Sequence, residues 1–270
     1  MTTSERPPSR GGGATLHCRA RITRRGRGHE FHLDVDLELA PGITILFGPS
    51  GSGKSTTLQC IAGLASPDDG YIALGDEVWF DSRRKIHLAV HRRHIAYVFQ
   101  SLALFPHLTG CHNVAYGLSR SMPRAERRDI AVAKLEHLGV GHLADRKPPT
   151  FSGGEAQRVA LARALAMNPR VILLDEPFSA LDRDLRIQLA TVVRQLVDEI
   201  NVPLIQVTHN HGEARALGDH ILRMKDGKVV QSGTTDEVLG DPRDILEART
   251  RARNAFDDIG KTPMPELRRK

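Results

Sequence analysis

One stretch, GPSGSGKST over residues 48–56, constrains the fold of this chain most, because it joins a continuously apolar run to a helical pattern. It satisfies the pattern G-x-x-x-x-G-K-[ST] in full. In such a loop the backbone wraps phosphate groups, the lysine supplies a positive charge to them, and the hydroxyl can bind Mg²⁺. The sequence therefore predicts a nucleotide site. The residues expected to contact the nucleotide are Gly48, Pro49, Ser50, Gly51, Ser52, Gly53, Lys54, Ser55 and Thr56.

Apolar patterning around this loop predicts an α/β fold with a parallel sheet. Buried strands are expected at ITILF (43–47), IAYVF (95–99), VILLD (171–175) and PLIQVTH (203–209). A helix from Lys54 to Ala62, closed by Gly63, follows the first strand, and the helical pattern over residues 101–165 predicts an inserted helical subdomain. Because parallel strands end at a common edge of their sheet, we expect ligands to bind at that edge.

The remaining segments define the expected domain boundaries. Residues 15–22 and 31–39 alternate apolar and polar side chains and are predicted to be half-buried strands. Residues 1–13 are polar and rich in Pro and Gly, with no apolar core of a signal peptide, so we expect a disordered tail. The main domain is predicted over residues 14–240, and a C-terminal helix with a loose tail over 241–270.

Two adjacent carboxylates, Asp175 and Glu176, stand where the strand VILLD ends. Successive strand residues point to opposite sides, so we expect Asp175 to serve a metal ion while Glu176 faces another point and polarises an attacking water. Taken alone, the pair could equally be two solvated acids at an exposed strand end. The presence of the phosphate loop in the same chain favours the catalytic and metal-binding interpretation of the pair over two solvated acids.

Two further residues follow predicted strands at this edge, and a separate stretch resembles a phosphate site. Gln100 and His209 follow two of the strands, although a lone Gln or His in such a place usually has a structural role. The stretch TFSGGEAQRVALARAL, residues 150–165, opens a helix with small residues, which is the geometry of a second phosphate cradle. Neither position nor composition explains why one chain needs two cradles.

Composition alone does not identify a ligand or partner. The formal net charge of +6 could reflect a nucleotide ligand, an anionic membrane surface or nothing in particular. The three cysteines form no CxxC pair, which fits a reducing cytosol, and no apolar run is long enough to cross a bilayer. A role at a membrane would therefore need a partner. Arginines over residues 19–27 lack interleaved aromatic side chains, so no nucleic-acid partner is expected.

Taken in order, these motifs resemble the ATPase subunits of ABC transporters. They are the phosphate loop, Gln100, FSGGE (151–155), VILLDEP (171–177), SALD (179–182) and THNH (208–211). The resemblance covers about residues 15–235. It implies a P-loop ATPase with a mixed central sheet, an antiparallel β subdomain and an inserted helical subdomain, which uses ATP and Mg²⁺ and hydrolyses ATP.

Carried over residue by residue, the resemblance also implies a role for the second cradle. Ser152, Gly153 and Gly154 would bind the γ-phosphate of ATP held on the phosphate loop of another copy, so the chain would form a homodimer with ATP between its subunits. Gln100 would contact Mg²⁺ and sense a membrane partner, and His209 would hold the γ-phosphate. The implied catalytic residues are Glu176, His209 and Gln100, and the implied magnesium ligands are Ser55, Gln100 and Asp175.

Longer stretches, among them RRHIAYVFQSLALFPHLTGCHNVAYGL, resemble the ATPase subunits of bacterial molybdate importers. The resemblance implies a peripheral protein at the cytoplasmic face of the cell membrane, which works with an integral permease and a separate solute-binding protein. Residues 101–118 would help to form the groove for the permease. Many such subunits carry an anion-binding C-terminal domain, which is not expected here. Import of sulfate, polyamine or iron is an alternative, and so is a soluble ABC ATPase outside transport.

A few residues depart from the family pattern. Phe151 replaces the usual leucine and Glu155 a frequent glutamine, and we expect activity to survive both changes. No aromatic residue occupies the usual position for stacking on adenine, some two dozen residues before the phosphate loop. Arg24, Arg25 and His29 are near that position, and a guanidinium can stack on a base instead.

Overall fold

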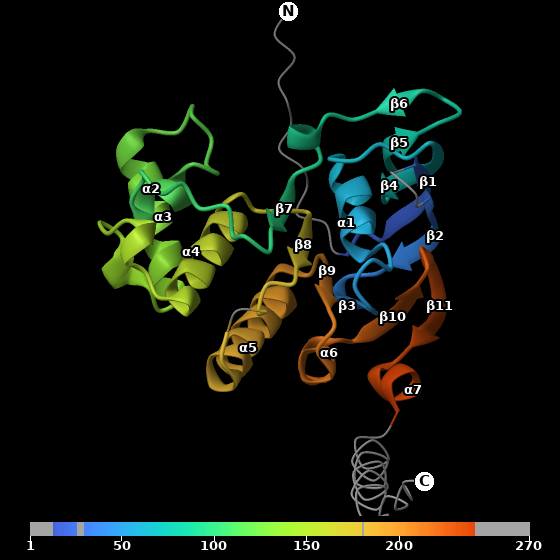
Figure 1. Ribbon diagram of the computed structural model, residues 1–270. Helices are drawn as coiled ribbons and strands as arrows, with labels where there is room; N and C mark the ends of the chain where they lie inside the picture. The colour runs from blue at the N-terminus through green and yellow to red at the C-terminus, as the bar shows by residue number, and fades with distance from the viewer. Residues whose placement is uncertain (1–12, 26–29, 180, 241–270) are drawn as a thin grey trace, which may run out of the picture.

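The computed structural model describes residues 13–25, 30–179 and 181–240. Figure 1 shows three parts, namely a central sheet with helices around it, an antiparallel sheet on one side, and a helical part on the other. The tail predicted over 1–13, apart from Gly13, and the segment predicted over 241–270 lie outside the described residues. Among the helices within the described ranges, none combines the length and the apolar character that crossing a membrane requires.

The central sheet is mixed, as predicted. From edge to edge its strands are β11 (Lys228–Gly233), β10 (His220–Lys225), β3 (Gly42–Phe47), β9 (Pro203–Thr208), β8 (Val171–Asp175) and β7 (Ile95–Val98). Neighbouring strands are parallel except β11, which pairs antiparallel with β10. The predicted strands therefore end at one common edge.

Both faces of this sheet are covered, which explains its continuously apolar strands. Ile45 of β3 joins the core beneath α5 (Arg183–Ile200) and α6 (His211–Leu217), whereas the next residue, Leu46, joins the core shared with α1 (Lys54–Ala62) and the antiparallel sheet. Helix α1 ends at Gly63 in a left-handed cap, as predicted. The short helix α7 (Thr235–Leu239) packs against β10 and β11.

The other two parts also agree with the predicted class. The antiparallel sheet has the order β2 (Glu30–Leu39), β1 (Leu16–Arg25), β4 (Asp69–Leu74), β5 (Glu77–Asp81) and β6 (Ile86–His87). The helical part contains α2 (Gly110–Ala115), α3 (Arg124–His137) and α4 (Gly153–Ala166), which pack against one another. Its helices begin only at Gly110, because residues 101–109 form a loop. Short 3-10 turns occur at Val90–Arg92, Gly141–Leu143 and Pro148–Thr150.

Candidate functional site

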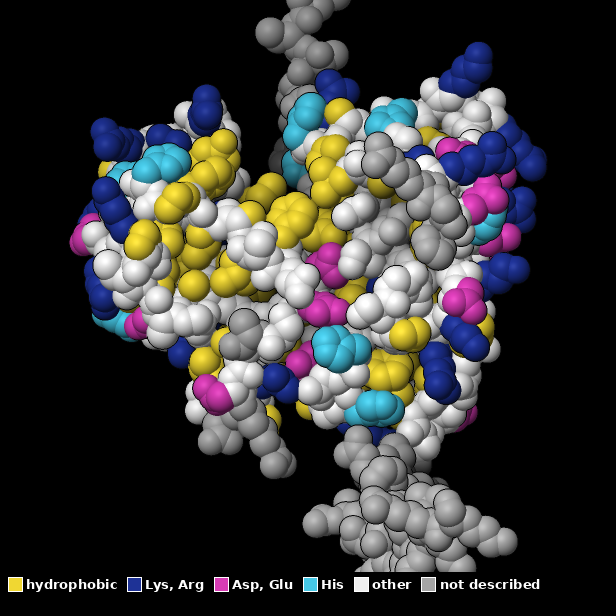
Figure 2. Space-filling model, viewed as in Figure 1, with side chains coloured by type: hydrophobic (Ala, Val, Ile, Leu, Met, Phe, Trp, Pro, Cys, Tyr) yellow, Lys and Arg dark blue, Asp and Glu magenta, His cyan; other side chains and the backbone are white. Residues whose placement is uncertain are grey.

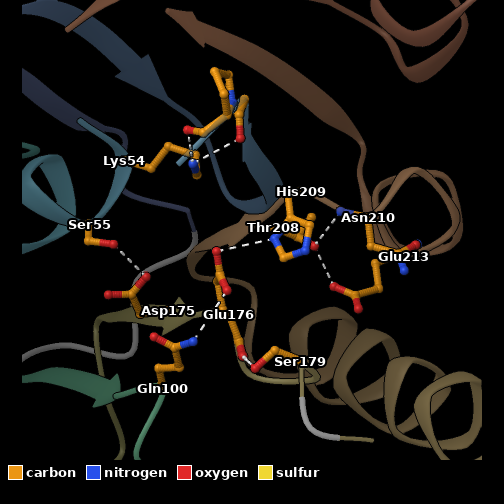
Figure 3. A network of polar contacts seen from close by, with 12 residues as sticks. Lys54, Ser55, Gln100, Asp175, Glu176, Ser179, Thr208, His209, Asn210 and Glu213 are labelled. Carbon is orange, nitrogen blue, oxygen red and sulfur yellow. Dashed lines mark hydrogen bonds and ion pairs between the residues drawn. The ribbon is translucent and has the colours of Figure 1, made fainter. Parts of the chain in front are cut away.

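The site residues predicted in the phosphate loop and at the strand ends meet at the carboxyl edge of the central sheet. The phosphate loop follows β3, Gln100 follows β7, Asp175 ends β8, and His209 follows β9. Figure 3 shows side chains from these four places turned toward a common region. The parallel topology therefore brings together residues that are far apart in the sequence.

Lys54 is held inside the phosphate loop. Its ammonium donates hydrogen bonds to the carbonyls of Gly48 (2.9 Å) and Pro49 (2.7 Å) and lies 3.5 Å from Ser52 Oγ. Burial lowers the pKa of Lys54, and the nearby carboxylates of Glu176 and Asp175 oppose that shift. The cation thus sits among oxygen acceptors that phosphate oxygens can replace.

Ser55, the first-turn neighbour of Lys54 on α1, contacts the end of β8. Its hydroxyl donates a 2.9 Å hydrogen bond to Asp175 Oδ1, and the Tyr97 hydroxyl lies 3.3 Å from Asp175 Oδ2. Burial raises the pKa of Asp175, while the hydrogen bonds from Ser55 and Tyr97 act in the opposite direction. A hydroxyl beside a carboxylate fits Mg²⁺, which binds few protein oxygens and completes its shell with phosphates and water.

Glu176 lies between Gln100 and His209. Gln100 Nε2 donates to Glu176 Oε2 at 3.4 Å, and His209 Nδ1 lies 3.3 Å from Glu176 Oε1. The alternation of a strand, from which the direction of Glu176 was inferred, does not apply, because β8 ends at Asp175 and Glu176 has a left-handed backbone with φ +47°. The backbone N–H of Glu176 donates a hydrogen bond to the carbonyl of Val207, and this bond fixes the turn against β9.

The turn that carries His209 is held by a polar network, which Figure 3 also shows. The Thr208 hydroxyl donates to Glu213 Oε2 at 2.6 Å and accepts the backbone N–H of Asn210. Glu213 is buried and pairs with Arg186 of α5 at 3.2 Å, and Asn210 caps α6 by accepting the N–H groups of Gly212 and Glu213. These bonds fix the backbone on both sides of His209.

A pocket beside the phosphate loop contains an aromatic residue that sequence reasoning missed. It is lined by Phe31, Ser50, Gly51, Gly53, Lys54, Ser55, Thr56 and Glu176. Phe31 comes from β2, and a Cβ added to Gly53 would lie 3.3 Å from its ring. A phenyl ring in this place can stack on a nucleobase. Of the alternatives, Arg24 and Arg25 are not among the lining residues, and His29 lies outside the described residues.

The second cradle begins α4 and contains a complete capping box. Ser152 Oγ accepts the backbone N–H of Glu155 at 3.3 Å, and Glu155 Oε2 accepts the backbone N–H of Ser152 at 2.7 Å. His142 Nε2 lies 2.9 Å from the other Glu155 oxygen. The hydrogen bond from the Ser152 backbone, followed by that of His142, lowers the pKa of Glu155 to about 2. The role of Glu155 in this cap is to accept the backbone N–H of Ser152, which the side-chain oxygen of a glutamine could also do.

The two glycines of this cradle have different surroundings. A Cβ on Gly153 would meet no atom within 4 Å, whereas a Cβ on Gly154 would lie 2.1 Å from Leu185 Cδ2. Gly153 therefore leaves open space at the helix N-terminus, and Gly154 allows close packing against α5. Ser152, Gly153 and Gly154 do not line the pocket beside the phosphate loop, so within this chain the structure keeps the two cradles apart.

A groove runs along the helical part beside α2 and α3. Leu108, Ala115 and Leu118 supply apolar surface, and Tyr116 beside them is 60% exposed. Arginines that line the groove are Arg120, Arg124, Arg127 and Arg128. Figure 2 shows hydrophobic side chains gathered on this part of the molecule with basic side chains around them. A partly exposed apolar strip with a basic margin is typical of a contact surface.

Comparisons with known proteins agree with this geometry. The chain matches the ABC transporter family over residues 33–179. It is 43% identical over 237 residues to the molybdenum import ATP-binding protein ModC of Bordetella pertussis, which covers 87% of this chain and 62% of that protein. It is 46% identical over 226 residues to the protein of the same name from Methylococcus capsulatus, which covers 83% of this chain and 61% of that protein.

A solved structure is similar as well. It is described as a dimeric structure of a post-hydrolysis state of the ATP-binding cassette MJ0796 bound to ADP and Pi, and it matches with a TM-score of 0.71 and 31% sequence identity. The match covers 82% of this chain and 98% of that one. By contrast, the chain spans about three-fifths of the length of the curated relatives it matches, 62% and 61% in the two examples.

Proposed function

This chain belongs to the ABC transporter family, and on that basis we propose that it is the ATP-hydrolysing subunit of an importer. It drives a separate membrane permease for molybdate or a related oxyanion, as the name of its ModC relatives suggests. The observation that carries the enzymatic part is the convergence of Lys54, the Ser55–Asp175 pair and Glu176 at one sheet edge. Residues 14–240 form the ATPase unit of the proposal.

Each residue of the site, including Phe31 of the antiparallel sheet, has a chemical task in the proposed reaction. Lys54 neutralises charge on the β- and γ-phosphates, and Phe31 stacks on the adenine. Ser55, Gln100 and Asp175 hold Mg²⁺, which offsets phosphate charge when bound. Glu176 orients the attacking water and accepts its proton, and His209 donates a hydrogen bond to the γ-phosphate. The contacts of Glu176 with Gln100 and His209 support this arrangement, because they hold the carboxylate in place.

The proposal includes a homodimer with ATP between its subunits. Ser152 and Gly153 are exposed at the start of α4, where aligned backbone N–H groups attract an anion. Because they do not line the phosphate-loop pocket of their own chain, they act in the proposed dimer on the pocket of the partner chain. The similar MJ0796 cassette is described as dimeric. Loss of the γ-phosphate then removes a group that both subunits bind, and the dimer opens.

The permease docks on the groove of the helical part. The apolar strip of the groove fits the apolar face of a short permease helix, and the four arginines of the groove favour acidic residues at the margin of that helix. Docking there holds the subunit at the cytoplasmic face of the membrane as a peripheral protein. A solute-binding protein completes the proposed importer.

Two experiments test the proposal in turn. The purified chain is expected to release phosphate from ATP in the presence of Mg²⁺, and Lys54→Ala is expected to abolish this release. No Lys54-dependent hydrolysis, either alone or with the copurifying permease, would contradict the enzymatic part. The copurifying solute-binding protein is then titrated with molybdate, tungstate and sulfate. Preference for sulfate, or binding of polyamine or iron instead, would replace the proposed cargo, and the absence of any membrane partner would favour a soluble ABC ATPase.

A further inference from the structure

The loop that follows Gln100 has a strained backbone. Leu102 and Ala103 are consecutive and both lie in the left-handed region, with φ +59° and +46°. This region is unfavourable for residues with a Cβ, and a pair of them persists only where the surroundings hold it. Within the loop, Leu102 N–H donates to the Phe99 carbonyl at 2.8 Å and Ala103 N–H donates to the Ser101 carbonyl at 2.7 Å. These bonds use the N–H groups of the pair, so a further restraint has to act on its carbonyls from outside the loop.

Arg163 of α4 supplies that restraint. Its Nη1 donates to the carbonyl of Ala103 at 2.7 Å, and its Nη2 donates to the carbonyl of Leu102 at 2.8 Å. The guanidinium carbon lies 5.7 Å from the centre of the Phe105 ring, which is within the range of a cation–π contact. The guanidinium binds the two carbonyls through two separate nitrogens in a fixed planar geometry, whereas a lysine has one nitrogen on a flexible stem and holds their orientation less firmly.

The two ends of the loop are attached to different elements. At the start, Gln100 Nε2 donates to Glu176. At the other end the fully buried Asn113 donates to the carbonyls of Phe105, Leu108 and Thr109, and its Oδ1 accepts the backbone N–H of Phe105. The left-handed pair lies between these anchors, so the path of the chain from Asn113 to Gln100 depends on the conformation that Arg163 holds.

We propose that Arg163 is a positioning residue for ATP hydrolysis, which keeps Gln100 against Glu176 by holding the left-handed pair Leu102–Ala103. Helix α4 is continuous from Gly153 to Ala166, and Arg163 lies about 16 Å along its axis from Ser152. The same helix therefore carries the second phosphate cradle at one end and the restraint on the Gln100 loop near the other. Its catalytic consequence rests on the proposed function, whereas the restraint itself does not.

The test uses Arg163→Lys in the full chain, with Arg158→Lys as the matched control. Arg158 lies on the same helix and faces the turn at Gly139. Arg163→Lys is expected to lower kcat for ATP about tenfold or more with KM within about twofold, because geometry at the reacting centre changes while nucleotide contacts do not. Arg158→Lys is expected to retain kcat. A thermal unfolding curve confirms that both variants are folded.

Hydrogen exchange of the nucleotide-free protein tests the restraint without relying on hydrolysis. Amides of residues 101–105 are expected to exchange about tenfold faster or more in Arg163→Lys, while those of α4 keep their protection. Adding Ala103→Gly removes part of the left-handed penalty and is expected to restore most of the lost kcat in the Arg163→Lys background. If Arg163 acted only by filling space, Ala103→Gly would not restore kcat.

The outcomes separate the two proposals. Unchanged exchange over residues 101–105, or a kcat that Ala103→Gly does not restore, would overturn the role of Arg163. A wild-type chain that does not hydrolyse ATP would instead overturn the proposed function, and the exchange data would still decide whether Arg163 holds the loop.

Discussion

Ser55 and Asp175 are 120 residues apart in the chain, and the Ser55 hydroxyl donates a 2.9 Å hydrogen bond to Asp175 Oδ1. The bond joins the first turn of α1 to the last residue of β8. Burial raises the pKa of Asp175, so its ionised form is less favourable in the folded protein than in water. The residue best placed to bind a cation is thus a source of instability when no cation neutralises it.

We expect Asp175→Asn to stabilise the metal-free protein at neutral pH. Because the folded pKa is raised, protonation of Asp175 favours folding below the ordinary value of 3.8, and this advantage is lost as the pH rises through the raised pKa. Asparagine stays neutral throughout. At about pH 7.5 in a chelator, Tm is expected to rise by about 2–4 °C. The difference is expected to shrink as the pH falls toward about 4, and Mg²⁺-dependent hydrolysis is expected to be lost.

Asp129→Asn is the control for this measurement, because Asp129 is exposed on α3. It is expected to leave Tm and hydrolysis unchanged. An Asp175→Asn protein that melts at or below the wild-type temperature at neutral pH would mean that the bonds from Ser55 and Tyr97 outweigh the cost of burial.

We expect Glu176→Gln to retain ATP binding and to accumulate an ATP-bound dimer. The amide preserves the shape of the side chain but cannot accept a proton from the attacking water, so kcat is expected to fall at least about 100-fold. Phosphate release and size-exclusion chromatography with ATP and Mg²⁺ measure the two effects. Glu199→Gln, at an exposed position of α5, serves as the control. Unchanged turnover in Glu176→Gln would remove Glu176 from the proposed mechanism.

The sheet edge could be predicted from the sequence because its signals are local. Apolar runs marked β3, β7, β8 and β9 to within a residue or two, and parallel topology then places the residues that follow them together. The direction of Glu176 could not be derived in this way. It depends on a left-handed residue after Asp175, where strand alternation has already ended.

Phe31 was missed for a different reason. In the sequence it begins an alternating strand and counts as a half-buried residue, so its pattern contains no sign of a ligand. Its place beside Gly53 depends on how the antiparallel sheet packs on the central part, where Asp34 N–H donates to the carbonyl of Gly227. Contacts of this kind join segments nearly two hundred residues apart, and periodicity within one segment does not report them.

We expect Phe31→Ala to raise KM for ATP about tenfold, because stacking of a base on an aromatic ring contributes about 1–3 kcal/mol. Phe31→Tyr keeps the ring and is expected to retain the wild-type KM. Binding of a fluorescent ATP analogue measures the loss without hydrolysis. Equal affinities of the Ala and Tyr variants would show that the base lies elsewhere.

We expect alanine substitutions at the two glycines of the second cradle to have different effects on stability and hydrolysis. Gly153→Ala places a methyl group in open space where the partner's phosphate binds in the proposed dimer, so Tm stays near wild type while hydrolysis falls. Gly154→Ala forces a shift of Leu185 and is expected to lower stability by about 1–3 kcal/mol, as overpacked sites do. Thermal unfolding and phosphate release distinguish the two variants. The reverse order of Tm values would contradict the different surroundings assigned to these residues.

Subunit mixing tests whether the second cradle acts on another chain. Ser152→Arg is expected to abolish hydrolysis, because the side chain blocks the phosphate site at the start of α4, yet to leave ATP binding by the isolated chain intact. Lys54→Ala is expected to be inactive because its phosphate loop is impaired, although its second cradle is intact. In a mixed dimer, the intact phosphate loop of the first variant faces the intact cradle of the second, so each mixed dimer regains one site and activity returns. Loss of ATP binding by the Ser152→Arg chain alone, or no recovery of activity on mixing, would contradict the proposal that the second cradle acts on another chain.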